Sequence, residues 1–166
     1  RLKKSDTLQL VTEKNKLKLV YRGKNTKTYY VPLIDLHEDK KNVKNLTTEV
    51  TVTMPSKVLS EAIDDVDVVG ESVKFSAEPG KLTISSEGDL SKADVELTES
   101  ETITVQTGEA QEARYSIEYL KKMIQADKLC DDVTVRFSNK YPVILEYDQE
   151  DVVSMSFILA PRVDNI

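Results

Sequence analysis

Apolar and polar residues alternate with a period of two along most of the chain. The alternation is clearest in a series of short segments: Leu8–Leu10, Leu17–Tyr21, Val50–Met54, Val73–Phe75, Leu82–Ile84, Val95–Leu97, Ile103–Val105, Val133–Phe137 and Val143–Tyr147. This pattern is typical of strands that turn one face to a core and the other to water. The sequence therefore predicts about ten half-exposed strands.

Turn-forming residues fall between several of these segments, at Asn15, Gly23–Asn25, Pro79–Gly80 and Asn139–Lys140. Short turns of this kind join strands that run in opposite directions. We therefore expect most consecutive strands to pair as antiparallel hairpins in a meander.

Two segments carry the helical period instead. Apolar residues at helical spacing follow Ser56 (Val58, Leu59, Ala62, Ile63 and Val66) and Ser116 (Ile117, Leu120 and Ile124). Serine before such a run is a common N-cap. The sequence predicts helices near 56–67 and 116–126, lying side by side and each capped by its serine, in an α+β fold.

An internal repeat links the two ends of the chain. The segment 6–33 recurs near the C-terminus, where Leu8 and Leu10 match Val133 and Val135, Leu17, Leu19 and Tyr21 match Val143, Leu145 and Tyr147, and Val31–Leu33 matches Ala160–Arg162. Fixed-period self-similarity of this kind indicates a duplicated unit. The second copy follows a predicted helix and the first follows only Arg1–Lys4, so the first domain is expected to be incomplete.

This repeat divides the chain into three parts. Residues 1–33 are expected to be the incomplete C-terminal part of a first domain, 34–48 a connector, and 49–166 a complete second domain. The connector is polar and has neither period. An ordered connector offers an edge to a partner peptide, and a mobile spacer is the alternative interpretation.

The composition of the chain excludes several classes of function. The chain has 166 residues and a net charge of −6, which argues against a surface that coats nucleic acid or anionic lipid. The single cysteine, Cys130, excludes an intrachain disulfide and favours a reducing, intracellular compartment. No apolar run approaches the roughly 20 residues that span a bilayer, so no membrane partner is expected.

Catalytic and metal-binding residues are scarce. His37 lies in a polar stretch that suits a solvated loop, and Cys130 precedes Asp131 and Asp132, which disfavour a reactive thiolate. The carboxylates Asp64, Asp65 and Asp67 lack the ligand spacing of a calcium loop, and the five glycines form no phosphate-binding loop. The sequence therefore predicts a protein that is not an enzyme and needs no cofactor or metal.

Several motifs together resemble a known family. The chain ends in Ile158-Leu159-Ala160-Pro161-Arg162-Val163, and supporting stretches are Leu33–Leu36, Met54–Ser56, Ser72–Phe75, Tyr115–Leu120 and Tyr141-Pro142. These stretches resemble DNA sliding clamps of the proliferating cell nuclear antigen type, especially archaeal members, over nearly the whole chain. The resemblance implies the DNA-clamp fold, with curved antiparallel sheets and two helices packed on one face of the complete domain.

The resemblance also implies an assembly. Full-length subunits of such clamps form a homotrimeric ring around double-stranded DNA, in which edge strands of neighbouring subunits pair. The matching edges here are Lys27, Thr28, Tyr29, Tyr30 and Val31 on one side, and Ala93, Asp94, Val95, Glu96 and Leu97 on the other. The connector 34–48 resembles the family's interdomain connector loop.

The resemblance further implies a channel lined by basic helices. The candidate channel residues are Lys3, Lys4, Lys57, Lys121, Lys122 and Lys128. Lys122 is the strongest candidate, because the apolar face of its helix places it outward. The first helix departs from the family pattern, since Glu61 and Asp64 accompany Lys57 on its outward side.

A final implication is a groove for client peptides. Its candidate residues are Val43, Pro142, Leu159, Ala160, Pro161 and Arg162. Pro161 lacks an N–H, so the backbone at Ala160 and Arg162 is expected to remain free for an extended peptide. The implied clients are a DNA polymerase, a clamp loader, a flap endonuclease and a DNA ligase, in the cytoplasm or nucleoid of an archaeon or the nucleus of a eukaryote. The alternative is a docking adaptor that forms no ring.

Overall fold

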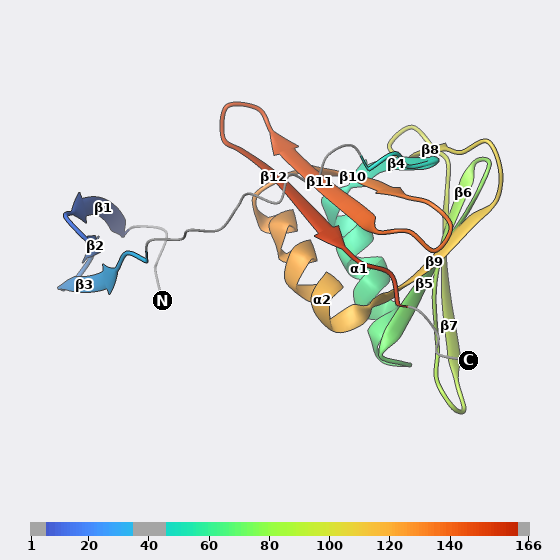
Figure 1. The fold of residues 1–166 in the computed structure, drawn as a ribbon, viewed down its shortest axis with the longest axis horizontal. Helices are drawn as coiled ribbons and strands as arrows, with labels where there is room; N and C mark the ends of the chain where they lie inside the picture. The colour runs from blue at the N-terminus through green and yellow to red at the C-terminus, as the bar shows by residue number, and fades with distance from the viewer. Residues whose placement is uncertain (1–5, 35–45, 163–166) are drawn as a thin grey trace. The chain divides into compact units, whose positions relative to one another are not determined.

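The computed structural model describes residues 6–34 and 46–162. Contacts between residues divide the chain into two units, Arg1–Asn45 and Leu46–Ile166. The predicted connector spans residues 34–48. Of these, residues 35–45 lie outside the described residues, and residues 34 and 46–48 are described. Each unit is therefore described by itself (Figure 1).

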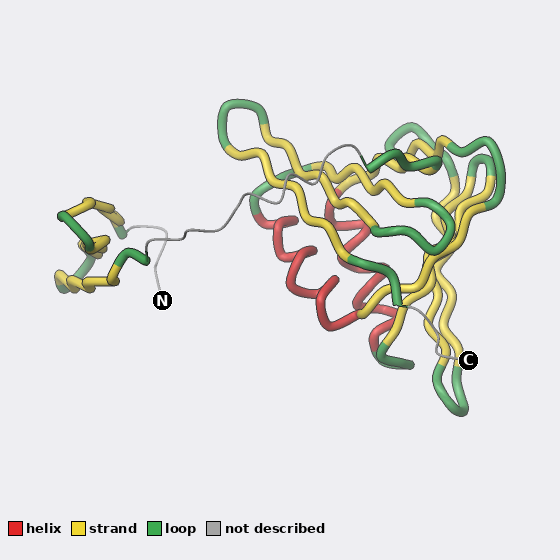
Figure 2. The backbone as a smooth tube through the Cα atoms, viewed as in Figure 1, coloured by secondary structure: helices red, strands yellow, loops and turns green. Residues whose placement is uncertain are grey.

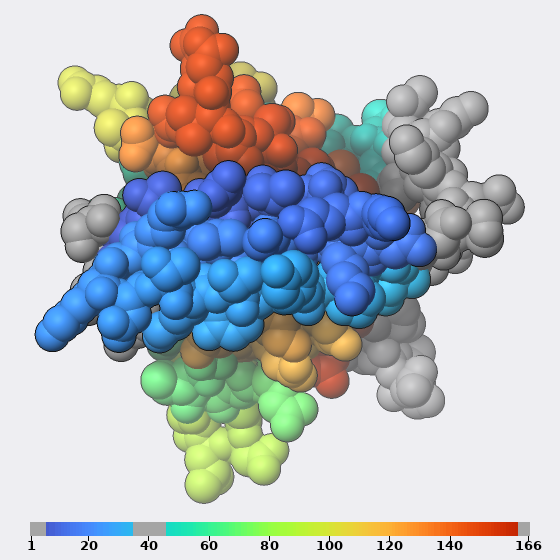
Figure 3. Space-filling model, turned by 90° about the vertical axis from the view of Figure 1, so that its left-hand side faces the viewer, coloured from blue at the N-terminus to red at the C-terminus, as the bar shows by residue number. Residues whose placement is uncertain are grey.

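The first unit is an antiparallel sheet of three strands, β1 (Thr7–Glu13), β2 (Lys16–Arg22) and β3 (Thr26–Pro32), in that order. The β1–β2 turn has Lys14 at a positive φ of 48° beside Asn15, as tight hairpin turns require. The described residues of this unit form this one sheet, and their atoms are blue in Figure 3.

One face of this sheet is apolar and open. Strand pairing sets Leu8 opposite Tyr21, and sets Leu19 between Leu10 and Tyr29. Residues opposite each other in a ladder share a face. Leu10 is 57% exposed and Tyr29 is 53% exposed. We call this surface the open apolar face; it consists of Leu8, Leu10, Leu17, Leu19, Tyr21, Tyr29 and Val31.

The second unit contains two antiparallel sheets. One has five strands in the order β12-β11-β10-β4-β8, and the other has four in the order β7-β6-β5-β9. The strands are β4 (Val50–Pro55), β5 (Ser72–Glu78), β6 (Lys81–Glu87), β7 (Lys92–Thr98), β8 (Thr104–Gln106), β9 (Gln111–Ser116), β10 (Asp132–Phe137), β11 (Val143–Gln149) and β12 (Val153–Leu159).

The hairpins predicted at the turn residues are confirmed, but a simple meander is wrong. β4 pairs with β10 and β8, and β5 pairs with β9, so strands distant in sequence become neighbours. These pairings close the sheets around a common core, which local turn signals cannot specify.

Two helical segments lie side by side and pack against strands of both sheets (Figure 2). Helix α1 spans Ser56–Asp67; helix α2 spans Ile117–Met123 and continues as the 3₁₀ helix η1, Ile124–Lys128. The predicted serine caps differ from the structure. Pro55 is the N-cap residue of α1, while Ser116 takes the N-cap position of α2 without a side-chain hydrogen bond. The fixed φ of proline suits the entry to a helix.

The core of the second unit is formed by the apolar faces of α1, α2 and both sheets. Phe75 on β5 is fully buried, and its ring centroid lies 5.4 Å from that of Tyr115 on β9 and 5.9 Å from that of Phe137 on β10. Because β5 and β10 belong to different sheets, Phe75 joins the two sheets through edge-on aromatic contact.

The internal repeat is visible in the strand register. Val133 pairs with Tyr147 as Leu8 pairs with Tyr21, and Val135 pairs with Leu145 as Leu10 pairs with Leu19. The third strand differs from the sequence match. Val143 pairs with Leu159, whereas its counterpart Leu17 pairs with Val31. Leu159, rather than Ala160, therefore takes the position of Val31.

Candidate channel, edge and groove residues

Four of the channel candidates, Lys57, Lys121, Lys122 and Lys128, lie on what we call the helix layer, formed by α1, α2 and η1. The Ser60 hydroxyl donates a hydrogen bond to Asp127 Oδ2 at 3.0 Å, so the first half of α1 lies beside η1. Near the other end of α1, Asp64 and Asp67 contact Lys121 of α2. The two helical segments therefore run in opposite directions.

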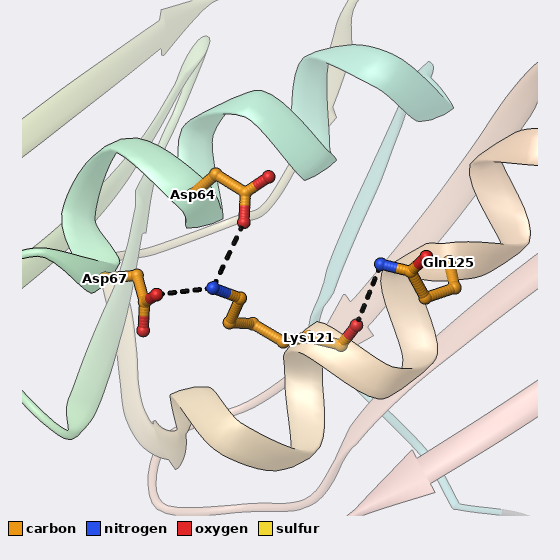
Figure 4. A network of polar contacts seen from close by, with 4 residues as sticks. All are labelled: Asp64, Asp67, Lys121 and Gln125. Carbon is orange, nitrogen blue, oxygen red and sulfur yellow. Dashed lines mark hydrogen bonds and ion pairs between the residues drawn. The ribbon is translucent and has the colours of Figure 1, made fainter.

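Lys121 links the two helices rather than pointing freely outward (Figure 4). Its Nζ lies 2.5 Å from Asp67 Oδ2 and 3.6 Å from Asp64 Oδ1. The hydrogen bond to Asp67 raises the pKa of the Lys121 ammonium, and the charges of both aspartates act in the same direction. The two carboxylates thus neutralise much of the positive charge of Lys121, which weakens its attraction for a phosphate group.

Lys122 is exposed, as the helical period predicted, but it is also paired. Its Nζ donates to Glu118 Oε1 at 2.8 Å and lies 5.0 Å from the ring centroid of Tyr119. This hydrogen bond raises the pKa of Lys122 and lowers the pKa of Glu118. An exposed pair of this kind contributes little stability, so a phosphate group can displace Glu118 at small cost.

The remaining channel candidates differ in what surrounds them. Lys57 is exposed and has no ion pair with any described residue, and the ammonium of Lys128 contacts the amide of Gln125. Lys3 and Lys4 lie outside the described residues. Within the described chain, Lys57 and Lys128 are therefore the channel candidates whose charge no carboxylate matches.

The candidate subunit-interface residues lie on edge strands. Lys27, Thr28, Tyr29, Tyr30 and Val31 belong to β3, at one edge of the first sheet. Ala93, Asp94, Val95, Glu96 and Leu97 belong to β7, at an edge of the four-stranded sheet. Edge strands carry unpaired backbone groups on their outer side, which is the requirement for pairing with another chain.

The structure brings most of the candidate groove residues together. The pairing of Val143 with Leu159 sets Pro142, which precedes β11, beside Ala160 and Pro161, which follow β12. Val43 lies outside the described residues. The described part of the candidate groove is thus one end of the β11–β12 ladder.

The expectation of a free backbone at Arg162 is wrong. Its N–H donates to the carbonyl oxygen of Arg114 on β9 at 2.7 Å, and its guanidinium lies 3.5 Å from the carbonyl oxygen of Glu71. Pro161 does end the β12 ladder, but the chain then crosses to the other sheet and pairs there. Arg162 is therefore held by the fold, which restricts the free backbone to the Ala160 side.

Sequence reasoning missed the role of β9 as an anchor for this region. The Tyr115 hydroxyl donates to the carbonyl oxygen of Tyr141 at 2.8 Å, directly before Pro142, and the Lys140 N–H donates to the carbonyl oxygen of Glu112 at 3.0 Å. Burial raises the pKa of Tyr115, so its hydroxyl stays protonated and keeps donating. Tyr115 stood out in the sequence only as part of the motif that opens α2.

An open cavity of about 910 Å³ lies where α1 ends and α2 begins. Arg162 is the candidate groove residue that lines it, together with residues 67–71, Ser116–Tyr119 and Lys121. Val68, on its rim, is 85% exposed. The cavity therefore adjoins the groove candidates at Arg162.

The described residues contain little that suits chemistry. Cys130 is buried, and burial raises the pKa of its thiol, as do the charges of Asp148 and Asp131. Among residues 6–34 and 46–162, no group of three or more His, Cys, Asp or Glu side chains is arranged to hold a metal ion. His37 lies outside this part of the chain. None of the described helices is long and apolar enough to cross a membrane.

In the second unit, two antiparallel sheets pack against a pair of helices, which is the arrangement of a DNA-clamp fold. Residues 42–162 match the family model described as "Proliferating cell nuclear antigen, C-terminal domain". The chain belongs to the proliferating cell nuclear antigen family, which confirms the resemblance inferred from its motifs.

Individual relatives agree with this assignment. The chain is 40% identical over 155 residues to the protein named DNA polymerase sliding clamp of Nanoarchaeum equitans, covering 92% of this chain and 62% of the relative. It is 33% identical over 167 residues to the protein of the same name from Pyrococcus horikoshii. This match covers 99% of this chain and 67% of that relative. It therefore spans about two thirds of the length of these relatives.

A solved structure confirms the fold class. The model matches the crystal structure of PCNA from Thermococcus kodakaraensis with a TM-score of 0.80 and 28% identity, covering 96% of this chain and 67% of that one. The names of these relatives also agree with the expectation that the chain is not an enzyme.

Proposed function

We propose that the chain acts as a subunit of a DNA sliding clamp, which encircles duplex DNA as a ring and tethers DNA polymerase and other replication and repair enzymes. The family match over residues 42–162 carries this proposal. In it, residues 1–33 are the C-terminal part of a first clamp domain, 34–48 the interdomain connector and 49–166 the second domain. The register shared by β1–β2 and β10–β11 supports the duplication.

A ring suits the charge of the protein. A clamp is retained on DNA by topology, so it needs no tight base contacts, and a net charge of −6 disfavours binding to DNA elsewhere on its surface. Three subunits close a ring when β3 of one pairs with β7 of the next. Pairing also covers the exposed tyrosines of β3, which contribute aromatic contact at the joint.

Tyr29→Asp should weaken this assembly. The substitution places a charge on a strand that must pair with another chain, where burial of an unpaired carboxylate is costly. Tyr119→Asp is the matched control, because Tyr119 is also 53% exposed but lies on α2. Light scattering of the full-length subunit over a concentration series should show loss of trimer for Tyr29→Asp and retention for Tyr119→Asp.

This chain, whose first domain is expected to be incomplete, should associate only weakly, so the test applies to the full-length subunit: a full-length subunit that remains a monomer throughout the series would contradict the ring. A protein-docking adaptor that uses the same groove without encircling DNA would then be the better proposal.

The proposed client site is the groove formed by the connector residue Val43, Pro142 and the chain end Leu159–Arg162. Its ligands are short peptides with a glutamine followed by spaced aliphatic and paired aromatic residues. Such anchors suit apolar walls beside a free backbone edge. The hydrogen bonds that β9 makes to Tyr141 and Arg162 support the proposal, because they hold both walls in fixed positions.

Peptide binding provides a second prediction. The double variant Leu159→Ala, Pro161→Ala should bind a fluorescent peptide of this kind at least about tenfold more weakly, equivalent to about 1.4 kcal/mol. Ile158→Ala is the control, because strand alternation places Ile158 on the opposite face of β12. Anisotropy titration measures both affinities. Equal affinity for the double variant and the wild type would place the groove elsewhere.

A further inference from the structure

The two copies of the internal repeat differ at one end of their ladders. In the first copy, the Leu33 N–H donates to the carbonyl oxygen of Asn15 at 2.7 Å, just beyond the terminal pair of β2 and β3, Lys16 with Pro32. This bond joins the chain after β3 to the turn before β2, as a further rung of an antiparallel ladder does. Backbone pairing therefore closes this end of the first copy.

The equivalent bond cannot form in the second copy. Leu159 takes the position of Val31, so two residues later Pro161 takes the position of Leu33. On the facing side, Tyr141 supplies the carbonyl oxygen that such a bond needs. Because proline has no N–H, Pro161 cannot donate to this oxygen. The second copy is therefore not closed in the way that the first copy is.

A tyrosine side chain supplies the missing donor. The Tyr115 hydroxyl donates to the carbonyl oxygen of Tyr141 at 2.8 Å. Tyr115 lies on β9 in the four-stranded sheet and is fully buried, and burial raises the pKa of its hydroxyl, which therefore stays protonated. A buried hydroxyl needs such a partner. The bond draws the turn before β11 toward β9 rather than toward the chain after β12.

Two further bonds hold the same turn against β9. The Asn139 N–H donates to Gln111 Oε1 at 2.8 Å, and the Lys140 N–H donates to the carbonyl oxygen of Glu112 at 3.0 Å. Residues 138–142 form this turn, whereas the matching turn of the first copy has only two residues. The extra residues of the second copy thus attach the turn to β9.

The chain after β12 is bonded to β9 as well, because the Arg162 N–H donates to the carbonyl oxygen of Arg114 at 2.7 Å. Within the described chain, the two sides of the ladder end therefore bond to β9 and not to each other. The terminal pair of this ladder is Val143 with Leu159. The backbone at Ala160, beyond that pair on an edge strand, is left for another extended chain to pair with.

We infer that Tyr115 is a positioning residue of the client groove. Its hydroxyl holds the Tyr141 carbonyl oxygen, to which Pro161 cannot donate, and so keeps the end of the β11–β12 ladder open for a client peptide. The inference rests on the proposed client site and adds to it a residue that touches no client, since Tyr115 is fully buried.

Removal of single hydroxyl groups tests the inference. Tyr115→Phe leaves the ring that contacts Phe75, and it should weaken binding of the fluorescent client peptide about fivefold, equivalent to about 1 kcal/mol. Tyr147→Phe is the matched control. Tyr147 is also fully buried, but its hydroxyl has no hydrogen-bond partner among the described residues, so its loss should leave the affinity unchanged.

A second substitution separates positioning from general stability. Pro161→Ala introduces an N–H, which in the Tyr115→Phe protein can donate to the vacated Tyr141 carbonyl oxygen and close the ladder as Leu33 closes the first copy. Pro161→Ala should therefore lower the urea midpoint less in the Tyr115→Phe protein than in the wild type, and it should lower peptide affinity in both. A purely structural role of Tyr115 predicts instead that affinity recovers together with stability.

The possible failures are distinguishable. Equal peptide affinity of Tyr115→Phe and the wild type, or equal losses for Tyr115→Phe and Tyr147→Phe, would overturn this inference and leave the client groove standing. Recovery of affinity together with stability in the double variant would overturn it as well. A wild-type protein that does not bind the peptide would overturn the client groove, and this inference with it.

Discussion

Phe75→Ala should lower the free energy of unfolding of the second unit by about 3–5 kcal/mol, the range observed when a buried phenylalanine is truncated. Phe75 is fully buried and contacts Tyr115 within its own sheet and Phe137 across to the other. Truncation leaves a cavity between the two sheets, where neither sheet can collapse without moving its whole ladder. Urea unfolding followed by circular dichroism measures the loss.

Two controls separate cavity formation from loss of apolar surface. Phe75→Leu retains much of the side-chain volume, so it should lower the free energy of unfolding by less than about 1.5 kcal/mol. Leu90→Ala removes a leucine that is 100% exposed and should change stability by no more than about 0.5 kcal/mol. If Phe75→Ala were as mild as Leu90→Ala, the aromatic contacts between the sheets would not stabilise the unit.

Gly88→Ala should destabilise the second unit by about 1–3 kcal/mol, as overpacking typically does. A Cβ at position 88 would lie 2.3 Å from the carbonyl oxygen of Val69, and one at Gly70 would lie 2.9 Å from the carbonyl oxygen of Glu87. The loop after α1 and the β6–β7 loop therefore approach backbone to backbone. A methyl group at Gly88 forces them apart.

Gly108→Ala is the matched control, because a Cβ there meets nothing within 4 Å. It should be neutral or stabilise by up to about 1 kcal/mol, because alanine restricts the unfolded chain. Thermal unfolding of both variants gives the comparison. A Gly88→Ala protein as stable as Gly108→Ala would mean that the two loops separate without cost.

Local pattern was sufficient to predict most of the described strands, the hairpins and α1, but β3, β9 and β12 were not among the alternating segments. Alternation with period two and the turn residues are short-range signals, and each acts within one hairpin. The one-residue difference in β12 shows their limit. Pro161 was matched to Pro32 by residue type, but the ladder aligns Leu159 with Val31, because register is fixed by burial of the facing side chains.

The errors at the candidate sites arise from long-range contacts. Lys121 was a channel candidate because of its charge, and its partner Asp67 lies on another helix, 54 positions away. Likewise, Pro161 correctly predicted the end of a ladder but gave no sign that the next N–H would reach Arg114. Ion-pair partners and chain crossings depend on tertiary packing. The residue types in the sequence therefore identified the candidates, but they could not predict which groups each candidate contacts.

The open apolar face gives the two copies of the repeat different dynamics. Val133, Val135 and Tyr147 are buried in the second unit, whereas the matching Leu8 and Leu10 are exposed in the first. A three-stranded sheet gains independent stability only when its apolar face is packed. Amide exchange in β10–β12 therefore requires opening of the core, whereas amides in β1–β3 exchange through local opening unless that face is covered. Two ladders of nearly identical register thus differ in how long their hydrogen bonds last.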